Sequence, residues 1–219
     1  MPFEIPLLND GNLRLRPHAA TDAEAVYQRS IDPLTQHWTT IPLDYTRELA
    51  AEYIAAISVP QDSAVSWALE ADGGYAGSLD LRFQGAASGN LGYVTAPDSR
   101  GQGLMSRAVQ LALGHAFDGL GWEVVTWTAN AGNVGSYKAV WRNGFPLPVA
   151  VPHFLPHRGQ MVEGWISSLT AAEPRVPSGP WADWDAVAAK LPPHGAAAEL
   201  QNLTEAREFT DLPQGARPA

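Results

Sequence analysis

Apolar and polar residues recur near the start of this chain at spacings that predict a strand, two helices and a loop. Residues 13–16 alternate apolar and charged side chains before a proline, which is typical of a short strand. Capping-box spacing at residue 21 predicts a helix through about residue 29. An apolar stripe at helical spacing predicts a second helix over residues 46–57. Two prolines interrupt residues 31–42, which we therefore expect to be loop.

The pattern then changes to one dominated by strands. Residues 71–74 read Ala-Asp-Gly-Gly between two apolar runs, a strong signal for a β-hairpin. The elements expected beyond residue 60 are strands over 64–70, 75–83 and 91–95, a helix over 104–117, a strand over 122–128, a helix over 134–142, and strands over 147–151 and 161–169. This order predicts an α/β or α+β fold with a mixed sheet, and excludes a repeat protein or a helical bundle.

Composition changes near the C-terminus. Residues 171–180 are rich in proline and predict a linker, residues 181–191 predict one short helix, and residues 212–219 are expected to be disordered. We therefore expect one domain over residues 1–170 and a Pro/Ala-rich extension over residues 171–219.

Charge and composition exclude several classes of protein. No apolar run approaches the roughly 20 residues that span a bilayer, and the N-terminus does not resemble a secretory signal. The chain contains no cysteine, so it has no thiolate metal site and no cysteine nucleophile, and we expect a cytoplasmic location. A net charge of -9 argues against a nucleic-acid binder and suits a cationic acceptor such as an amine.

The most informative chemistry lies where the strand 91–95 leads into the helix that begins at residue 104. Arg100, Gly101, Gln102 and Gly103 form a glycine-containing turn there. Glycine lets the backbone approach a ligand closely, and the free N–H groups of a helix start attract an anion such as pyrophosphate. The same glycines would also serve a tight strand-to-helix turn with no ligand.

Two other phosphate-binding loops fit poorly. A Walker loop needs Lys and then Ser or Thr after its last glycine, but Leu104 and Met105 stand there. A dinucleotide fingerprint needs Gly or Ala three positions after Gly103 and an acidic residue at the end of the next strand. The chain has Ser106 at the first of these positions and no carboxylate at the second.

The turn resembles the acyl-CoA pyrophosphate loop of the GNAT superfamily, in which Arg or Gln is followed by two residues, Gly, one residue, and Gly or Ala. Met105 departs from the last position. A second element, Asn133 with Ser136 and a helix that ends in Gly144-Phe145, resembles the RimJ/RimL-like branch. The resemblance covers about residues 13–169. It implies a mixed, mostly antiparallel, twisted sheet with helices on both faces.

The resemblance also implies the co-substrate and its site. Acetyl-CoA, or another acyl-CoA, would lie between the strands 91–95 and 122–128, and an amine would attack the thioester directly. A backbone N–H near Val94 would hold the thioester oxygen. The expected cofactor-binding residues are Tyr93, Val94, Arg100, Gly101, Gln102, Gly103, Leu104, Met105, Ser106, Asn130, Asn133 and Ser136.

The leaving thiolate needs a proton or a hydrogen bond. Many family members use a late tyrosine, but the matching position here is Val140. Ser136 matches the serine of the RimL-like branch and is the expected donor, with Tyr137 as a substitute. Helix capping is the alternative interpretation for Ser136, and the preferred one for Asn133.

The sequence does not identify the general base, because Asn90 occupies the position where the family often has Glu. Asp80 and Glu163 are the candidate bases and acceptor-binding residues. His37 and Trp38 are further candidates for the acceptor pocket. Water is an alternative base.

The sequence allows three other interpretations. A metal site could be built from His115, His153 and His157. However, prolines exclude a helix at the last two, and no carboxylate nearby in the sequence completes a ligand set, so we expect no metal. A non-catalytic acyl-CoA sensor is the main alternative function, and a dinucleotide oxidoreductase is a distant third. The acceptor is expected to be a small amine or a protein N-terminus, and the resemblance makes a homodimer plausible.

Overall fold

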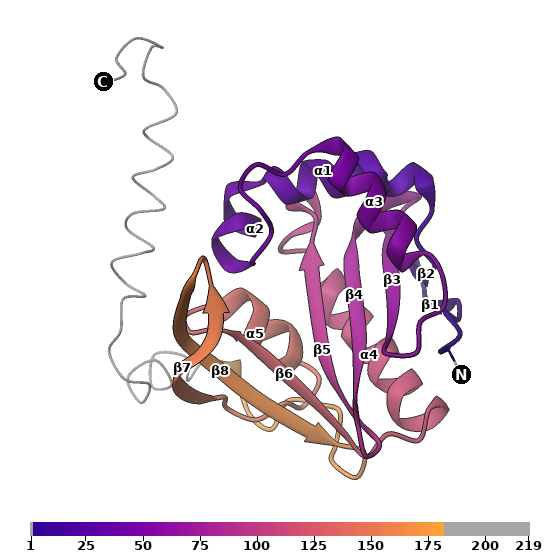
Figure 1. Ribbon diagram of the computed structural model, residues 1–219. Helices are drawn as coiled ribbons and strands as arrows, with labels where there is room; N and C mark the ends of the chain where they lie inside the picture. Colours follow the sequence, from indigo (N-terminus) through magenta and orange to yellow (C-terminus); the bar gives the residue numbers. More distant parts are fainter. Residues whose placement is uncertain (1, 182–219) are drawn as a thin grey trace, which may run out of the picture. The chain divides into compact units, whose positions relative to one another are not determined.

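The computed structural model describes residues 2–181, and the compact unit within them extends to Pro180. Eight strands of this part form one sheet in the order β1-β2-β3-β4-β5-β6-β8-β7 (Figure 1). The strands are β1 (Leu8–Asp10), β2 (Leu13–Arg16), β3 (Ala64–Ala71), β4 (Gly74–Gly85), β5 (Ser88–Thr95), β6 (Val124–Asn130), β7 (Val149–His157) and β8 (Gln160–Thr170). Every pair is antiparallel except β5 with β6, so the expected mixed, mostly antiparallel sheet is confirmed.

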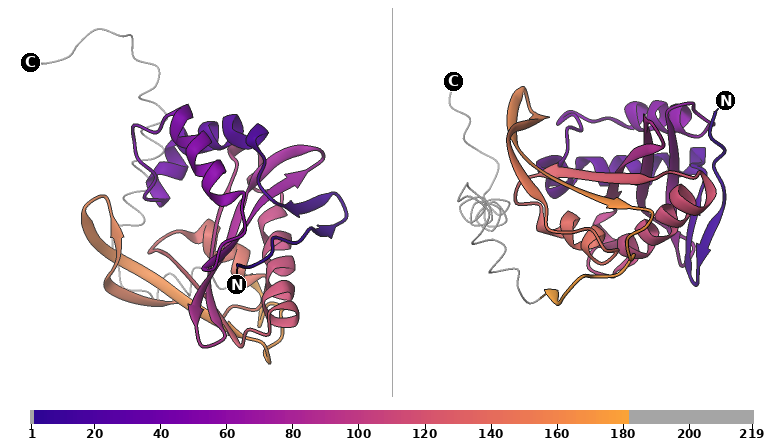
Figure 2. Two further views of the ribbon diagram at one scale, coloured as in Figure 1. Left: turned by 45° about the vertical axis from the view of Figure 1, so that its right-hand side comes forward. Right: turned by 90° about the horizontal axis from the view of Figure 1, so that it is seen from below.

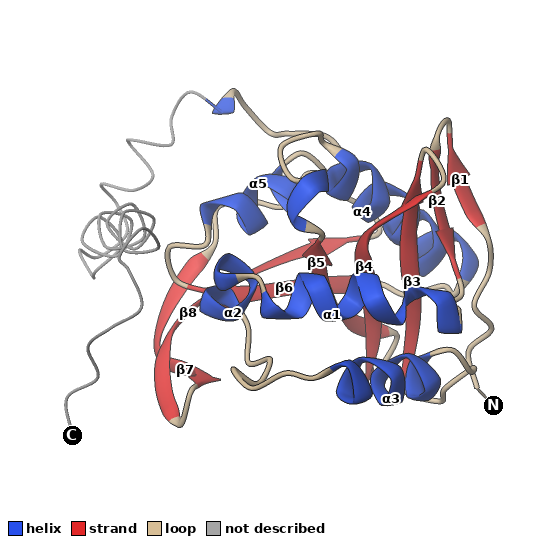
Figure 3. Ribbon diagram, turned by 90° about the horizontal axis from the view of Figure 1, so that it is seen from above, coloured by secondary structure: helices blue, strands red, loops and turns tan. Residues whose placement is uncertain are grey.

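Helices cover both faces of the sheet, as expected (Figure 2, Figure 3). On one face lie α1 (Ala23–Ile31), α2 (Pro33–Trp38) and α3 (Arg47–Ile57). On the other lie α4 (Leu104–Gly114) and α5 (Val134–Trp141). Short 3-10 turns cover Ala20–Asp22 (η1) and Pro97–Ser99 (η2), and α4 runs into a π-helical turn, His115–Gly119 (η3). No helix in the described part of the chain is long and apolar enough to cross a membrane.

Strand alternation sends the apolar side chains of the central strands to the α4 and α5 side. Leu79, Leu81 and Leu91 are buried, and Trp67 and Trp127 are among the largest fully buried side chains. Each such burial contributes about 1.5–3 kcal/mol to folding. The opposite face of β4 carries Ser78, Asp80 and Arg82 instead, so the two faces of the sheet differ in chemistry.

Strands β5 and β6 separate part-way along their length. Their parallel pairing runs from Ser88 with Val124 to Leu91 with Trp127 and ends there. Beyond that point β5 continues to Thr95 against β4 alone, while β6 continues against β8. Figure 1 shows β6 and β8 turning away from β5. The sheet therefore opens at its centre, directly before the glycine turn.

Two expectations near the N-terminus are corrected. Residues 31–42 are not all loop, because α2 begins at Pro33. Asp32 caps this helix by accepting a hydrogen bond from Thr35 N at 2.8 Å. Proline is tolerated at the first helical position because an N–H there would have no partner within the helix. The capping hydrogen bond before α1 is donated by Ala19 N to the Asp22 carboxylate at 2.8 Å. The capping residue therefore lies two residues before the predicted one at residue 21.

Strand β1 was not predicted from the sequence, and the remaining elements occur in the predicted order, with shifted ends. The predicted helix 104–117 is α-helical only to Gly114, and the strands β5 and β7 extend beyond the predicted ranges. Residues 171–180 pack on the domain, because Arg175 pairs with Asp118 at 2.7 Å and lies over the Phe117 ring. The predicted helix 181–191, beyond its first residue, and the predicted disordered end 212–219 lie outside the described residues.

Candidate active site

The glycine turn has the geometry of an anion-binding helix start. Gly101 and Gly103 both have φ of 76°, a conformation that favours glycine. Gly103 is the N-cap of α4, and no side chain caps the helix. Its carbonyl accepts the first helical bond, from Arg107 N at 3.3 Å. The N–H groups at the start of α4 therefore remain available to a phosphate.

Arg100 points away from this helix start and onto α2. Its guanidinium donates to the Asp32 carboxylate and to Thr35 Oγ1, the latter at 2.9 Å. Burial alone would raise the pKa of Asp32, but the bonds from Arg100 and from Thr35 N bring it below its ordinary value. In this geometry Arg100 anchors α2 beside the turn.

A second cation, which the sequence reasoning missed, lies beside the turn. Arg142 follows α5, and its Nη1 donates to Ser106 Oγ at 3.4 Å. The same nitrogen would lie 4.0 Å from a Cβ placed on Gly103. The next residue, Asn143, is buried and donates to Ser106 O at 2.8 Å and to Ala139 O at 2.9 Å. The bond from Asn143 to Ser106 O fixes the end of α5 against the first turn of α4.

The opening between β5 and β6 exposes the backbone of β5 on one side. Ala96 N donates across to Ala76 of β4 at 2.9 Å. Because N–H groups alternate along a strand, Val94 N–H also faces β4, whereas those of Tyr93 and Thr95 face the opening. The oxyanion donor expected near Val94 would thus come from one of its neighbours. An extended pantetheine chain could pair with this free edge.

Three side chains join the two separated strands to α5. Trp127 Nε1 on β6 donates to Ser136 Oγ at 3.1 Å, and Ser136 Oγ donates to the Tyr93 hydroxyl at 3.1 Å. The Tyr93 hydroxyl donates to Ser136 O at 2.6 Å. Burial raises the pKa of Tyr93 well above its ordinary value, so its phenol stays neutral. The predicted proton donor, Ser136, thus lies inside a hydroxyl network at the opening.

The neighbouring candidates have structural partners. Asn133 accepts a bond from Ser136 N at 3.1 Å and caps α5, as preferred from the sequence. Asn130 Nδ2 contacts His157 Nδ1 at 3.1 Å. Tyr137 is almost fully buried against Trp127, and burial raises its pKa to about 12.

Asp80 lies on the polar face of the sheet, at the level where the opening begins. It is paired in register with Gly92 on β5 and with Ser66 on β3. Its side chain is 22% exposed, and its Oδ1 is buried without a hydrogen bond among the described residues. Burial raises the pKa of Asp80, and the charge of Arg82 and the Ser66 hydroxyl offset only part of this effect.

Glu163 is not brought to Asp80. Ala131 N donates to Glu163 O at 3.0 Å, which continues the ladder that pairs Ala129 with Trp165. Alternation along β8 therefore directs Glu163 to the α5 side of the sheet, opposite to Asp80. The sequence could not show this, because the phase of β8 depends on its register with β6.

His37 and Trp38 lie together at the end of α2, with ring centroids 4.4 Å apart. The turn between β7 and β8 reaches this region. Arg158 in that turn donates to Gln36 O at 2.7 Å and to Ile41 O at 2.9 Å. The predicted acceptor-pocket residues on α2 are thus tied to the β7–β8 hairpin.

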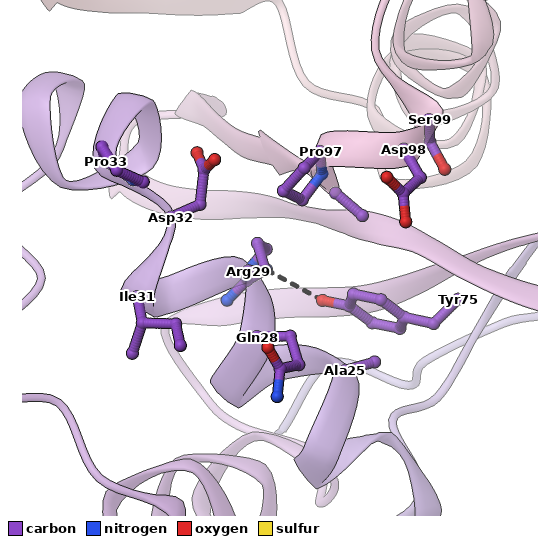
Figure 4. A pocket seen from close by; sticks show the side chains of 11 residues that line it. Ala25, Gln28, Arg29, Ile31, Asp32, Pro33, Tyr75, Pro97, Asp98 and Ser99 are labelled. Atoms are coloured by element: carbon purple, nitrogen blue, oxygen red, sulfur yellow. Dashed lines mark hydrogen bonds between the residues drawn. The ribbon is translucent and has the colours of Figure 1, made fainter. Parts of the chain in front are cut away.

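A cavity of about 540 Å³ lies between α1 and the η2 turn (Figure 4). Arg29 lies in it and donates to the Tyr75 hydroxyl at 2.8 Å and to Ser78 Oγ at 2.5 Å. Asp32 and Asp98 are among the residues that line it. The lining does not include Tyr93 or Ser136, so this cavity is separate from the hydroxyl network.

Among the described residues, no three His, Cys, Asp or Glu side chains are grouped to hold a metal ion. His115 contacts the Trp67 ring at 5.6 Å, and His153 contacts the carbonyl of Met161 at 3.4 Å. The tryptophans Trp67, Trp122, Trp127 and Trp165 are all buried.

A family model described as an acetyltransferase (GNAT) domain matches residues 12–146, which is more than half of the chain. This chain belongs to the GNAT acetyltransferase family. The resemblance seen in the sequence is therefore confirmed. As a GNAT protein, it is an acyl-CoA-dependent N-acetyltransferase.

Solved GNAT structures share its fold. An acetyltransferase of the GNAT family from Bacillus anthracis superposes with a TM-score of 0.70 at 16% identity, covering 77% of this chain and 100% of that one. Mycobacterium smegmatis RimJ, in complex with CoA-disulfide, gives 0.62 at 19%, covering 78% and 88%. RimL, described as a ribosomal L7/L12 alpha-N-protein acetyltransferase in complex with coenzyme A, gives 0.66 at 16%, covering 75% and 98%. None of the curated proteins compared matches this chain.

Proposed function

We propose that this GNAT protein transfers an acetyl group from acetyl-CoA to a primary amine at the opening between β5 and β6. The observation that carries the proposal is the end of β5–β6 pairing at Leu91 and Trp127, which leaves a free backbone edge next to an uncapped helix start. Acetyl-CoA supplies the activated acyl thioester. The N–H groups at the start of α4, with Arg142 beside them, provide the positive environment that a pyrophosphate requires.

Each remaining part of the reaction has a candidate residue in the described chain. The backbone N–H of Tyr93 or Thr95 is placed to stabilise an oxyanion. Asp80, with its raised pKa, accepts a proton from the ammonium acceptor as it approaches along the polar face. The Ser136 hydroxyl donates a hydrogen bond to the leaving thiolate, and its bonds to Trp127 and Tyr93 fix its orientation.

The acceptor is proposed to be a small amine or a protein N-terminus. The RimJ and RimL neighbours favour the second by analogy of fold. A cytoplasmic location and a homodimer stay predictions.

Calorimetric titration with acetyl-CoA tests the site. Gly103→Ala should weaken binding at least tenfold, because a side chain at φ of 76° distorts the turn. Gly73→Ala is the matched control: it has φ of 80° in the β3–β4 turn, with open space around the added Cβ. Equal binding by the two variants would contradict the proposed cofactor site.

Release of free CoA with a panel of amines then tests the chemistry. Turnover by the wild type, lost on substitution of Ser136 or Asp80, supports the assigned roles. Tight binding of acetyl-CoA with no amine-dependent release would instead favour the acyl-CoA sensor.

A further inference from the structure

Arg82 occupies an unusual place on the polar face of the sheet. It lies on β4 two residues after Asp80, and the β5 residue opposite Asp80 is Gly92. The guanidinium of Arg82 lies over Gly92, so that a Cβ on this glycine would overlap it. Gly92 is also the first β5 residue after the last pair with β6. The lack of a side chain at position 92 therefore makes room for a cation where the sheet opens.

The guanidinium of Arg82 has donors to spare. Its one ion pair among the described residues, with Asp80 Oδ2, is 3.6 Å long, which exceeds a hydrogen bond. The side chain is 55% exposed. By contrast, Arg16 is held by Asp22 at 2.7 Å and by Glu70 at 2.7 Å. A guanidinium carries five N–H donors in a planar fork, and its preferred partner is a carboxylate that accepts two of them.

Asp80 and Arg82 together present opposite charges, 3.6 Å apart, to the same side of the sheet. An acceptor that carries an amine and a carboxylate a few bonds apart would match this pair, with its amine at Asp80 and its carboxylate at Arg82. We propose that Arg82 selects such acceptors: an α-amino acid, or a peptide whose N-terminal end carries an acidic side chain. This inference rests on the proposed function, which brings the acceptor amine to Asp80.

A second role for Arg82 has to be separated from selection. Its positive charge also lowers the pKa of Asp80. If that were its whole contribution, removal of Arg82 would change the rate with every amine by the same factor. Selection predicts an effect that depends on the acceptor, so the informative quantity is a ratio between two acceptors.

The experiment compares kcat/KM for matched acceptors in wild type and in Arg82→Gln. One pair is glycine and glycinamide; the other is alanyl-aspartyl-alaninamide and its asparaginyl counterpart. Comparing each pair across the two proteins cancels the different basicity of the amines. From wild type to Arg82→Gln, the ratio of kcat/KM for the carboxylate acceptor to kcat/KM for its neutral partner should fall at least tenfold, about 1.4 kcal/mol. Which pair shows the effect separates an amino acid from an acidic peptide.

Arg14→Gln is the matched control. Arg14 is 54% exposed and pairs with Glu70 at 3.7 Å, on β2 and away from the opening. It should keep the wild-type ratio. If Arg82→Gln lowers kcat/KM by the same factor for both members of each pair, selection by Arg82 is overturned.

Failure of the proposed function gives a different result. In that case the protein binds acetyl-CoA but acetylates neither pair and no other amine of the panel. Calorimetry of the CoA-loaded protein with N-acetylglycine and N-acetylglycinamide then tests Arg82 without turnover. Binding of the carboxylate compound that is lost in Arg82→Gln supports the carboxylate site, and equal binding in both proteins refutes it.

Discussion

Ser136 and Tyr93 exchange hydrogen bonds across the opening of the sheet. The Ser136 hydroxyl donates to the Tyr93 phenol at 3.1 Å, and the phenol donates to the Ser136 carbonyl at 2.6 Å. Both protons are thus engaged in this state. For Ser136 to hydrogen-bond a thiolate, its hydroxyl must rotate away from Tyr93, while Trp127 Nε1 continues to hold the oxygen.

This geometry makes Ser136 testable by substitution. Ser136→Ala should lower kcat by a factor of about 10², with little change in the affinity for acetyl-CoA, because the lost group serves the leaving thiolate. The rate of CoA release and calorimetry measure the two effects. Ser136→Thr keeps the hydroxyl and should retain more activity. A kcat for Ser136→Ala within twofold of wild type would exclude the proposed donor.

The pH dependence of the reaction should report Asp80. A base must be ionised, so kcat/KM should rise with pH through the raised pKa of this carboxyl. Arg82→Gln removes a charge that lowers this pKa and should therefore move the acidic limb of the profile to higher pH. Asp80→Asn should abolish that limb and most of the activity. An unchanged limb in Asp80→Asn would assign the base elsewhere.

Ionisation of the Asp80 carboxyl should lower the free energy of unfolding. Its folded-state pKa lies above the unfolded value, so the unfolding free energy should fall as pH rises from about 3.9 to the raised pKa. Denaturant titrations of wild type and Asp80→Asn across this range measure the effect. The difference between the two proteins should grow with pH, in favour of Asp80→Asn, and a constant difference would contradict a raised pKa.

Local signals explain which parts the sequence could predict. The glycine turn, the hairpin at residues 71–74 and the serine element are short patterns with a defined backbone, and the structure has them at the predicted places. The sequence pattern does not predict helix α2, because Pro33 reads as a helix breaker, although Asp32 before it supplies the cap. The sequence signal, Asp followed by Pro at the first helical position, was present.

Other features depend on contacts between distant segments. Nothing near Arg142 in the sequence indicates that α5 ends beside the start of α4. Asn143 can be buried there because its side chain donates to Ser106 O and Ala139 O. The direction of Glu163 depends on the register between β6 and β8. These relationships come from packing and lie beyond any local pattern.

Replacing Arg100 and Arg142 by alanine, one at a time, should have different effects on CoA binding and on stability. Arg142→Ala should weaken CoA binding several-fold, with a reduced salt dependence and unchanged stability, because its guanidinium lies at the helix start and is exposed. S-acetylpantetheine, which lacks the phosphates, should bind both proteins equally.

Arg100→Ala should instead destabilise the fold, by about 1–3 kcal/mol, because Asp32 loses a charged partner at the cap of α2. Calorimetry and urea unfolding together give the two readouts. The reverse pattern, with stability lost at Arg142 and affinity alone lost at Arg100, would restore Arg100 as the phosphate ligand.

The docking of residues 171–180 can be tested at Gly144, which has φ of 93°. A Cβ at this position would overlap the Pro174 carbonyl and approach Val176 N to 3.2 Å. Gly144→Ala should therefore lower the unfolding free energy through both backbone strain and overlap. Gly121→Ala is the matched control, because Gly121 has φ of 68° and open space around the added Cβ.

The control should lose about 1–2 kcal/mol from the left-handed conformation alone, and Gly144→Ala a further 1–3 kcal/mol, roughly, from overpacking. Because the overlapping atoms belong to Pro174 and Val176, deletion of residues 174–219 should remove the extra loss and make the two variants equal. An extra loss that persists in the shortened chain would mean that Gly144→Ala acts through α5 alone and does not report the docking of residues 174–176.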